Sequence, residues 1–560
     1  MLKIISKSLP IFLLFLTVYF MKNLNFVFYN SFDSPDFLDY FNYFEYFFNQ
    51  QTSPGREQGL FYFYTHAWHF FINYNDFNSI NFYTYIHKSI QEVNFYFYTF
   101  GLLGYYCLLN ELKFTKKTAI YTLIFLNFFP VSIVSRLIFK PEIVAFAFLP
   151  WIILCLEKFL STKKIKFIVF SSPFIILSAL SKGSVLAILL TFLTINYLPK
   201  IFFSLKKSTF LLLIISFVGL FSLVAIEDIS TNNRNLIDIQ SGSNDRPEWN
   251  FKAPVDIIYK VEFYKLVSSP IKNQHADSFL AITTLDTFGD YFDLFWNNDA
   301  SLYFQNRKEI ISFQESNLIK APEFDQNKKS ITIYLQKNTD IYLRSVIGLF
   351  LTILFYYKII KQIINKNKYR KFLMAPFIGI SIILFHIISG FPINNFNPLL
   401  GDTLKPIYYS YFVCLAAVFL IANIIEERKG KILLLIPYIL IIIFLLGFPK
   451  ASFDSSNGAY NRQFITINNY SPFCEVNEYL FLDKNLISND HHCDRNDSGF
   501  QRSDNLINLD GFNNKPRFKF GNTLLGVLSL LSSLAILVNI YSVDTRRIKK
   551  FFSFSLNNNK

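Results

Sequence analysis

Long apolar segments that carry almost no charge recur along this chain of 560 residues, and they restrict its fold more than any other feature. Hydrophobic residues make up 52% of the sequence, and the mean hydropathy is +0.29. A helix needs about 20 such residues to cross the hydrocarbon core of a bilayer. The pattern therefore predicts an all-α polytopic membrane protein with about twelve transmembrane helices. The expected spans are 8–29, 94–110, 118–138, 141–158, 165–181, 184–198, 209–227, 341–358, 372–390, 405–425, 432–448 and 521–543.

Basic residues lie on alternate connections between these segments, which predicts that both termini are cytoplasmic. The basic connections are the N-terminus and 113–117, 158–166, 200–207, 358–371, 428–431 and 546–550. They account for much of the net charge of +14, because cytoplasmic loops face anionic headgroups, and we find no nucleic-acid motif. The first segment could be a cleaved signal peptide, but its long apolar stretch and the lack of a small-residue cleavage site favour an uncleaved anchor.

The remaining connections are long and predicted to lie on the outer side. We divide the chain into an N-terminal transmembrane module with its first outer loop, a large outer loop, further transmembrane helices, a second large outer loop, and a last helix with a basic tail. The corresponding residues are 1–227 (first outer loop 30–93), 228–340, 341–448, 449–520 and 521–560. Long polar loops on one side indicate that the working surface faces outward.

The first outer loop begins with an acidic cluster of Asp33, Asp36 and Asp39. Pro35 suits the first turn of a helix, and the aromatic residues in 40–47 and 60–71 predict two helices lying in the membrane interface. Asp36 would then lie near the positive end of a helix dipole, close to the membrane. The competing interpretation is that these carboxylates only solubilise the loop and cap the helix.

One span, an acidic outer loop with interfacial helices, many further spans and more outer loops together resemble the GT-C superfamily of lipid-linked sugar glycosyltransferases, such as protein mannosyltransferases and lipid A aminoarabinose transferases. Locally, Pro35-Asp36-Phe37-Leu38-Asp39-Tyr40 is similar to the Pro-Asp with a Tyr four residues later in that family's first loop. Only Asp36 and Tyr40 carry over from this motif.

The resemblance implies that Asp36 acts as general base, or positions the acceptor, when a hydroxyl or amine attacks the anomeric carbon and polyprenyl phosphate leaves. The family often has a second acidic residue beside the first, whereas Phe37 stands there in this chain, so Asp33 or Asp39 would have to substitute. We therefore predict no definite cofactor and leave a divalent metal open.

Arg136, Lys140 and Glu142 lie at the predicted outer turn between the third and fourth spans. The two cations could bind a lipid phosphate, with Glu142 orienting one of them or contacting a sugar hydroxyl. Snorkelling toward the headgroups is the alternative. Lys182, which interrupts an apolar hairpin on the same side, could join this cationic cluster, although a lone lysine at a turn is commonly interfacial.

Lys405 precedes the tenth predicted span beside Tyr408 and Tyr409, where it could meet a lipid phosphate or belong to an aromatic belt. Cys474 and Cys493 share the last outer loop, which predicts a disulfide. A metal site with the adjacent histidines, 491 and 492, is the competing idea.

We therefore expect a membrane glycosyltransferase that moves a sugar from a polyprenyl-phosphate donor to a lipid, glycan or protein acceptor. We expect a bacterial inner membrane, with both termini in the cytoplasm and the long loops in the periplasm, and an organelle lumen is the other compartment. A transporter or flippase of lipid-linked saccharide would also have about twelve helices, but we find no similarity between the two halves. A polysaccharide polymerase, working on similar substrates, is a further alternative.

Overall fold

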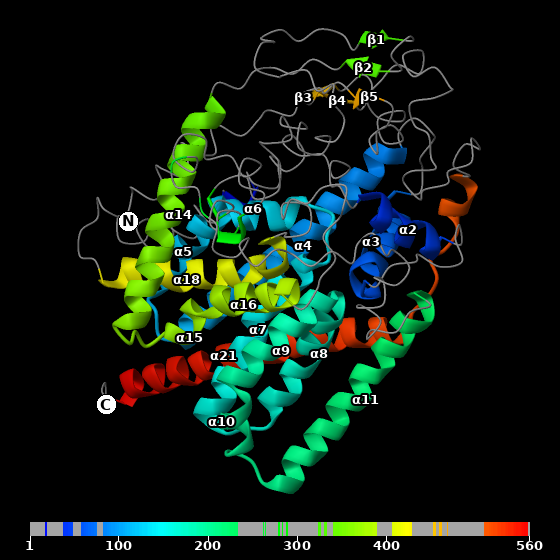
Figure 1. Ribbon diagram of the computed structural model, residues 1–560. Coiled ribbons are helices and arrows are strands. Elements are labelled where there is room, and N and C mark those ends of the chain that lie inside the picture. Colours follow the sequence, from blue (N-terminus) through cyan, green and yellow to red (C-terminus); the bar gives the residue numbers. More distant parts are fainter. Residues whose placement is uncertain are drawn as a thin grey trace.

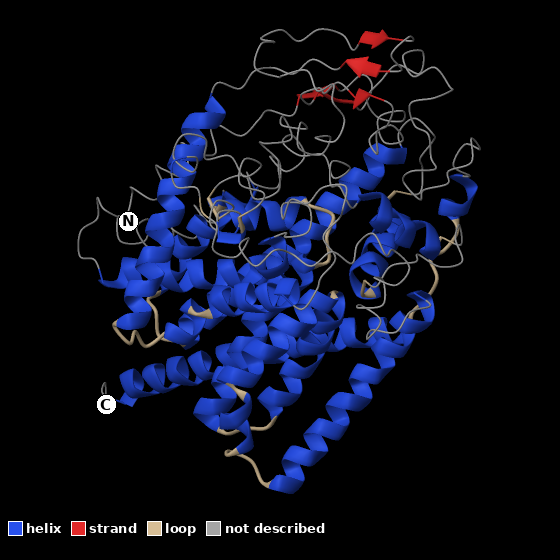
Figure 2. Ribbon diagram, in the orientation of Figure 1, coloured by secondary structure: helices blue, strands red, loops and turns tan. Residues whose placement is uncertain are grey.

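The computed structural model shows a mostly helical protein (Figure 1). It describes residues 37–48, 58–74, 82–232, 340–388, 406–427 and 509–557, together with short pieces at 17–19, between 261 and 332, and between 452 and 468. Figure 2 shows that helices make up nearly all of the described part and that the strands lie together at one end.

The N-terminal half supplies most of the described helices, and it follows the predicted apolar segments closely. These helices are α2 (Phe37–Phe47), α3 (Leu60–Asn73), α4 (Phe82–Glu111), α5 (Lys116–Phe128), α6 (Pro130–Leu137), α7 (Glu142–Thr162), α8 (Lys166–Ser181), α9 (Gly183–Asn196), α10 (Leu198–Phe202) and α11 (Lys207–Asn232). The later helices are α14 (Asp340–Ile364), α15 (Arg370–Leu373), α16 (Ala375–Ile388), the short 3₁₀ helix η6 (Pro406–Tyr409), α18 (Ser410–Glu427), η9 (Leu509–Asn513) and α21 (Phe520–Asn557).

Among the described residues, five helices are long and apolar enough to cross a membrane, namely α7, α11, α14, α18 with η6, and α21. The bent pair α5 and α6 makes a sixth if it counts as one span, and α8 and α9 are shorter apolar helices. These helices support an all-α membrane protein. The full count of about twelve spans stays a prediction, because segments such as 432–448 lie outside the described residues.

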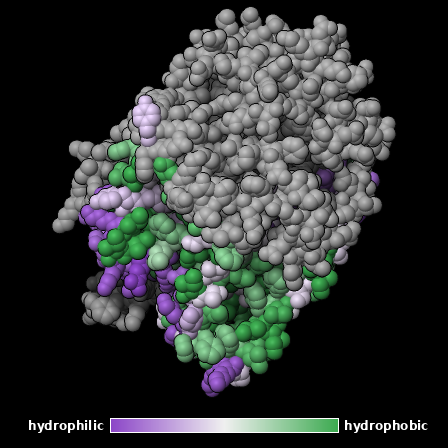
Figure 3. Space-filling model, viewed as in Figure 1, coloured by the Kyte–Doolittle hydropathy of each residue, from purple (hydrophilic) through white to green (hydrophobic). Residues whose placement is uncertain are grey.

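Two of the apolar helices form the centre of the molecule and two form its edge. In α7 and α18, 83% and 89% of the apolar window is buried inside the protein, compared with 11% in α11 and 28% in α21. α7 packs closely on α4 because Gly104 has no side chain; a Cβ there would lie 2.8 Å from both Pro150 and Trp151. Figure 3 shows hydrophobic residues gathered over the lower part of this view, where α9, α10 and α11 lie.

The helices expected at 40–47 and 60–71 are present as α2 and α3. Their aromatic side chains, however, are buried within the protein: Tyr43, Phe44 and Phe63 are all 0% exposed. The rings of Tyr43 and Phe63 stack with centroids 4.3 Å apart. These faces therefore contact neighbouring helices rather than lipid headgroups.

Five short strands come from the two large predicted outer loops. They are β1 (Glu323–Asp325), β2 (Ser330–Thr332), β3 (Ser452–Asp454), β4 (Ala459–Asn461) and β5 (Ile467–Asn468). β3 pairs with β4, and the other sheet has the antiparallel order β1-β2-β5, with Ser330 opposite Asn468. β5, which comes from the second of these loops, therefore pairs with a strand of the first.

Candidate functional site

The turn between α6 and α7 is fixed by side chains of α4. Gln91 donates a hydrogen bond to the Leu137 carbonyl and Asn94 donates one to the Ile138 carbonyl, both at 2.9 Å. These bonds satisfy carbonyls that the end of α6 leaves without helical partners. Pro141 then precedes Glu142, the first residue of α7, so its carboxylate lies at the positive end of the helix dipole.

Glu142 forms an ion pair with Lys182, which lies 40 residues later in the chain. The distance from Nζ to Oε1 is 2.8 Å, and the two side chains are 12% (Lys182) and 1% (Glu142) exposed. We call these residues the outer pair, because they lie at the end of α7 that the charge pattern predicts to face outward. Two of the residues chosen from the sequence therefore meet in space.

Backbone pairing holds Lys182 in place. The residue has extended geometry between α8 and α9, and it forms an antiparallel bridge with Gln58. The amide of Gly59 donates a 3.1 Å hydrogen bond to the carbonyl of Ser181. A Cβ at Gly59 would lie only 2.0 Å from the carbonyl oxygen of Leu180, so no other residue fits without a shift of the backbone.

Two tyrosines surround the ammonium group of Lys182. The Tyr40 hydroxyl accepts a long hydrogen bond from Nζ at 3.4 Å, and the Tyr408 ring centroid lies 4.6 Å from Nζ. Lys140 is 5.9 Å from the centroid of the Tyr40 ring. Four candidate residues thus lie around one point. Tyr40 comes from α2, Lys140 and Glu142 come from the α6–α7 turn, and Lys182 comes from the break between α8 and α9.

The environment of Glu142 contains further hydroxyl groups that the sequence did not single out. Oε2 of Glu142 and the hydroxyl of Tyr411 are buried and have no hydrogen-bond partner among the described residues. Tyr411 lies close enough to interact electrostatically with Glu142. Burial raises the pKa of the Tyr62 phenol well above its usual value, and the charge of Glu142 raises this pKa further. Both phenols are therefore neutral and can serve as hydrogen-bonding groups.

Arg136 has a different environment from the outer pair. Its guanidinium lies 4.9 Å from the centroid of the Tyr98 ring and donates a 3.1 Å hydrogen bond to the carbonyl of Asn127. That carbonyl is at the end of α5, where the chain bends by 64° into α6. The side chain is 1% exposed, so its described contacts favour a role in stabilising the bend.

Several predicted site residues lie outside the described part of the chain. Asp33, Asp36, Lys405, Cys474 and Cys493 are among them, as are the histidines at 491 and 492. Asp39 lies in α2, but its side chain is not described. The free cysteines at 107, 155 and 414 are buried, as expected for small apolar residues in spans. The roles of Asp36, Asp33, Asp39 and Lys405 and the disulfide therefore stay predictions.

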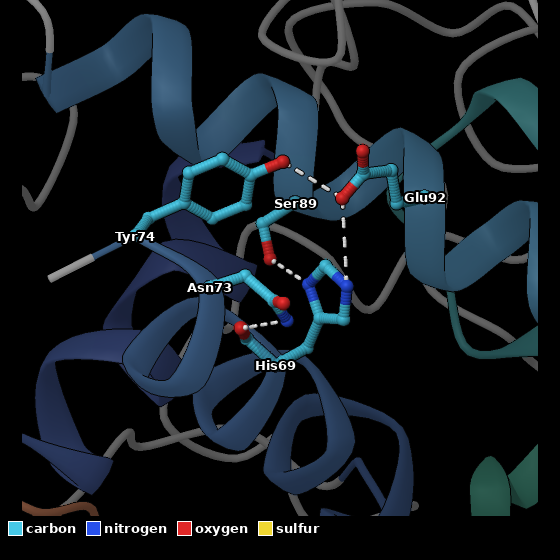
Figure 4. Close-up of polar contacts among 5 residues, drawn as sticks. All are labelled: His69, Asn73, Tyr74, Ser89 and Glu92. Atoms are coloured by element: carbon cyan, nitrogen blue, oxygen red, sulfur yellow. Dashed lines mark hydrogen bonds and ion pairs between the residues drawn. The ribbon is translucent and has the colours of Figure 1, made fainter.

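A second polar cluster joins α3 to α4 (Figure 4). His69 Nδ1 lies 2.9 Å from Ser89 Oγ, its Nε2 lies 3.5 Å from Glu92 Oε2, and the Tyr74 hydroxyl donates a 2.7 Å hydrogen bond to the same carboxylate oxygen. Serine, histidine and glutamate occur together, and the contacts just given bond all three side chains within the cluster. The cluster is a connection between helices.

Burial also affects two histidines of α3, namely His69 in this cluster and His66 one turn before it. It lowers the pKa of His69, with Glu92 acting in the opposite direction, and it lowers the pKa of the fully buried His66 much further. Within the described residues, no group of three histidine, cysteine or acidic side chains is arranged to hold a metal ion.

The opposite end of α7 carries a similar ion pair, between Glu157 and Lys371, which we call the inner pair. The Tyr197 hydroxyl donates a 2.7 Å hydrogen bond to Oε1 of Glu157, the same oxygen that pairs with Lys371. Lys371 also lies 4.9 Å from the centroid of the Tyr197 ring. This arrangement provides a matched control for the outer pair.

No family model matches this chain, and no curated protein is significantly similar to it. The case for its function therefore rests on the sequence motif and on the geometry of the outer pair.

Proposed function

We propose that this protein is an integral membrane glycosyltransferase of GT-C type, which transfers a sugar from a polyprenyl-phosphate donor to an acceptor at the outer face of the membrane. One observation carries the proposal: Tyr40, from the segment that resembles the family motif, contacts Lys182, which is paired with Glu142. These residues come from three separate segments, and each was a substrate-binding candidate from the sequence alone.

The proposed reaction is a direct displacement that inverts the anomeric carbon. An acceptor hydroxyl forms the new bond to this carbon while the bond to the phosphate oxygen breaks, and polyprenyl phosphate leaves with the electron pair. Asp36, four residues before Tyr40, takes the acceptor's proton. Lys140 and Lys405 are the cations proposed to stabilise the negative charge that develops on the leaving phosphate.

The surroundings of the outer pair suit a substrate that is half lipid. Lys182 lies directly before α9, and α9 exposes Leu190 and Ile195 along its length. Apolar side chains therefore lead from the outer pair along a helix that is suited to the hydrocarbon region. A polyprenyl chain could follow them while its phosphate and sugar lie at the polar end.

A transfer assay tests this function. The protein in lipid nanodiscs is incubated with radiolabelled polyprenyl-phosphate sugars and a cell-envelope extract, and transfer of label is measured. We expect Asp36→Asn to reduce transfer at least about 100-fold, as for loss of a general base, and Glu157→Gln in the inner pair to leave it nearly unchanged. Full transfer by Asp36→Asn, or none by the wild type with a broad donor panel, contradicts the proposal.

Transport of a lipid-linked saccharide is the second candidate, and the break between α5 and α6 favours it. Discontinuous helices with buried charge commonly line substrate paths in transporters. A flippase would move a fluorescent polyprenyl-phosphate sugar between the leaflets of a vesicle without any acceptor. A transferase alone would leave that distribution unchanged, so the two functions give different results in one vesicle preparation.

A further inference from the structure

The outer pair has little net charge to offer a phosphate group. Lys182 is the cation that the sequence would assign to the phosphate, but the carboxylate of Glu142 lies 2.8 Å from its ammonium. At 1% exposure, this carboxylate cannot turn away into water. An incoming phosphate would be attracted by the ammonium and repelled by the adjacent carboxylate, and the two effects largely cancel.

The hydrogen-bonding capacity that remains is of mixed type. A lysine ammonium has three donors, of which one is directed to Glu142 and another makes only the long 3.4 Å contact with Tyr40. Oε2 of Glu142 has no donor, and the Tyr411 hydroxyl has no partner among the described residues. A ligand that satisfies both sides must donate as well as accept. Hydroxyl groups do so, whereas the anionic phosphodiester of the donor only accepts.

An aromatic surface adjoins these polar groups. The Tyr408 ring lies below the Lys182 ammonium, 4.6 Å from Nζ, and the residue is partly exposed. A flat aromatic face packs well against apolar C–H groups, and the phenol provides a polar edge. A sugar ring has both an apolar face and a rim of hydroxyls, so it matches this combination better than a phosphate does.

We infer that the outer pair and Tyr408 form a subsite for the hydroxyl groups of an uncharged sugar, and that the phosphate of the donor binds elsewhere. The inference rests on the proposed function, because it assigns one part of the lipid-linked donor to one part of the site. Lys182, Tyr408 and Oε2 of Glu142 contact the sugar, and Oε1 of Glu142 holds the ammonium in position. Because the pair has almost no net charge, it does not attract the phosphate to the place where the sugar must lie.

Binding measurements with separate halves of the donor test this assignment. We would measure saturation-transfer NMR for a panel of methyl hexopyranosides, and the affinity of farnesyl phosphate, with full-length protein in nanodiscs. The double variant Lys182→Met/Glu142→Gln removes both charges together, so it is expected to weaken binding of the best glycoside at least about 10-fold and to leave farnesyl phosphate unaffected. Glu142→Gln exposes the ammonium charge, so it should tighten farnesyl phosphate binding about 3- to 10-fold. Lys371→Met and Glu157→Gln should change neither.

The outcomes separate this inference from the function beneath it. Loss of farnesyl phosphate affinity in the double variant, or a wild type that binds no glycoside, overturns the sugar subsite. If glycosides bind and the variants behave as expected, but no label is transferred from any donor, then the sugar subsite is supported and the transferase function is contradicted. If the double variant does not fold, Tyr408→Ala is used instead, since it removes the aromatic surface and keeps both charged side chains, and it too should weaken only the glycoside.

Discussion

The outer and inner pairs each join a glutamate of α7 to a lysine from another part of the chain, yet they differ in how completely their bonds are satisfied. In the inner pair, one oxygen of Glu157 receives both Lys371 and a short hydrogen bond from Tyr197. In the outer pair, the hydrogen bond from Lys182 to the Tyr40 hydroxyl is long, at 3.4 Å, and Oε2 of Glu142 has no partner among the described residues. The outer pair is also more deeply buried, with Glu142 1% exposed against 16% for Glu157.

This difference shows how a structural contact can be distinguished from a binding contact of the same chemistry. A fully bonded, partly solvated ion pair joins helices and needs nothing further. A deeply buried pair with unused bonding capacity lowers stability unless another group completes it, and such groups are commonly found where ligands bind. The inner pair is the reference against which changes in the outer pair can be measured.

The largest expected effect comes from separating the outer pair from its backbone support. In Gly59→Ala, the new Cβ would lie 2.0 Å from the Leu180 carbonyl oxygen, so the pairing that positions Lys182 must shift. We expect a loss of about 3 kcal/mol in stability, together with loss of glycoside binding. Gly219→Ala is the control, since nothing lies within 4 Å of its Cβ and helix propensity favours alanine. Thermal melting of Gly59→Ala at the wild-type temperature would disprove the support role.

Lowering the pH should destabilise the region around the outer pair, which includes α3, before the region around the inner pair. Burial lowers the pKa of His66, so the folded state keeps this imidazole neutral below pH 6.5 while the unfolded state becomes protonated. Stability from this residue is full above its unfolded pKa and falls as the pH drops below it, by at most about 1.4 kcal/mol per pH unit. Melting curves from pH 8 to pH 5 measure this loss. His66→Leu should flatten the profile, and an unchanged profile would show that another group causes the acid sensitivity.

Double-mutant cycles compare the two pairs directly. Removing one partner of a buried pair leaves an uncompensated charge, whereas removing both leaves none. We expect a coupling free energy of about 2 kcal/mol for Glu142→Gln with Lys182→Met, and about 1 kcal/mol for Glu157→Gln with Lys371→Met, because water screens the more exposed pair. Equal couplings would mean that burial does not determine the difference between the pairs.

The smallest effects concern the two tyrosine hydroxyls. Tyr197→Phe removes a 2.7 Å hydrogen bond to a carboxylate and should cost about 1.5 kcal/mol. Tyr40→Phe removes a 3.4 Å contact and should cost less than about 0.5 kcal/mol in stability. Denaturant titration of both variants measures these differences. A larger cost for Tyr40→Phe would show that its hydroxyl is bonded more strongly than the distance indicates.

Much of the local structure could be predicted from the sequence, because the apolar segments have clear ends. The expected spans 165–181 and 184–198 correspond to Lys166–Ser181 and Gly183–Asn196 within two residues. Charge at the ends of such segments also identified Glu142 and Lys182 as candidates. Their pairing could not be predicted, since it depends on how α7 packs against α8 and α9, and periodicity contains no information about partners.

Other features of the site depend on long-range geometry in a similar way. The importance of Gly59 arises from a carbonyl more than 100 residues later in the chain, and nothing near it in the sequence indicates this. The aromatic residues of α2 and α3 suggested a membrane interface, because a pattern of apolar residues does not distinguish protein neighbours from lipid. Arg136 was chosen for its charge, but the direction in which its side chain points depends on the bend between α5 and α6.

The spacing of the two glutamates along α7 sets a distance that can be compared with the thickness of a bilayer. Glu142 and Glu157 are separated by 15 residues of helix, a rise of roughly 22 Å, whereas the hydrocarbon core of a typical bilayer is about 30 Å thick. A membrane-crossing α7 therefore places at least one pair below the level of the headgroups, where protein must replace water around the charge. Thinner bilayers bring both pairs nearer to water, so lipid chain length should tune the strength of these two contacts and the helix packing that they join.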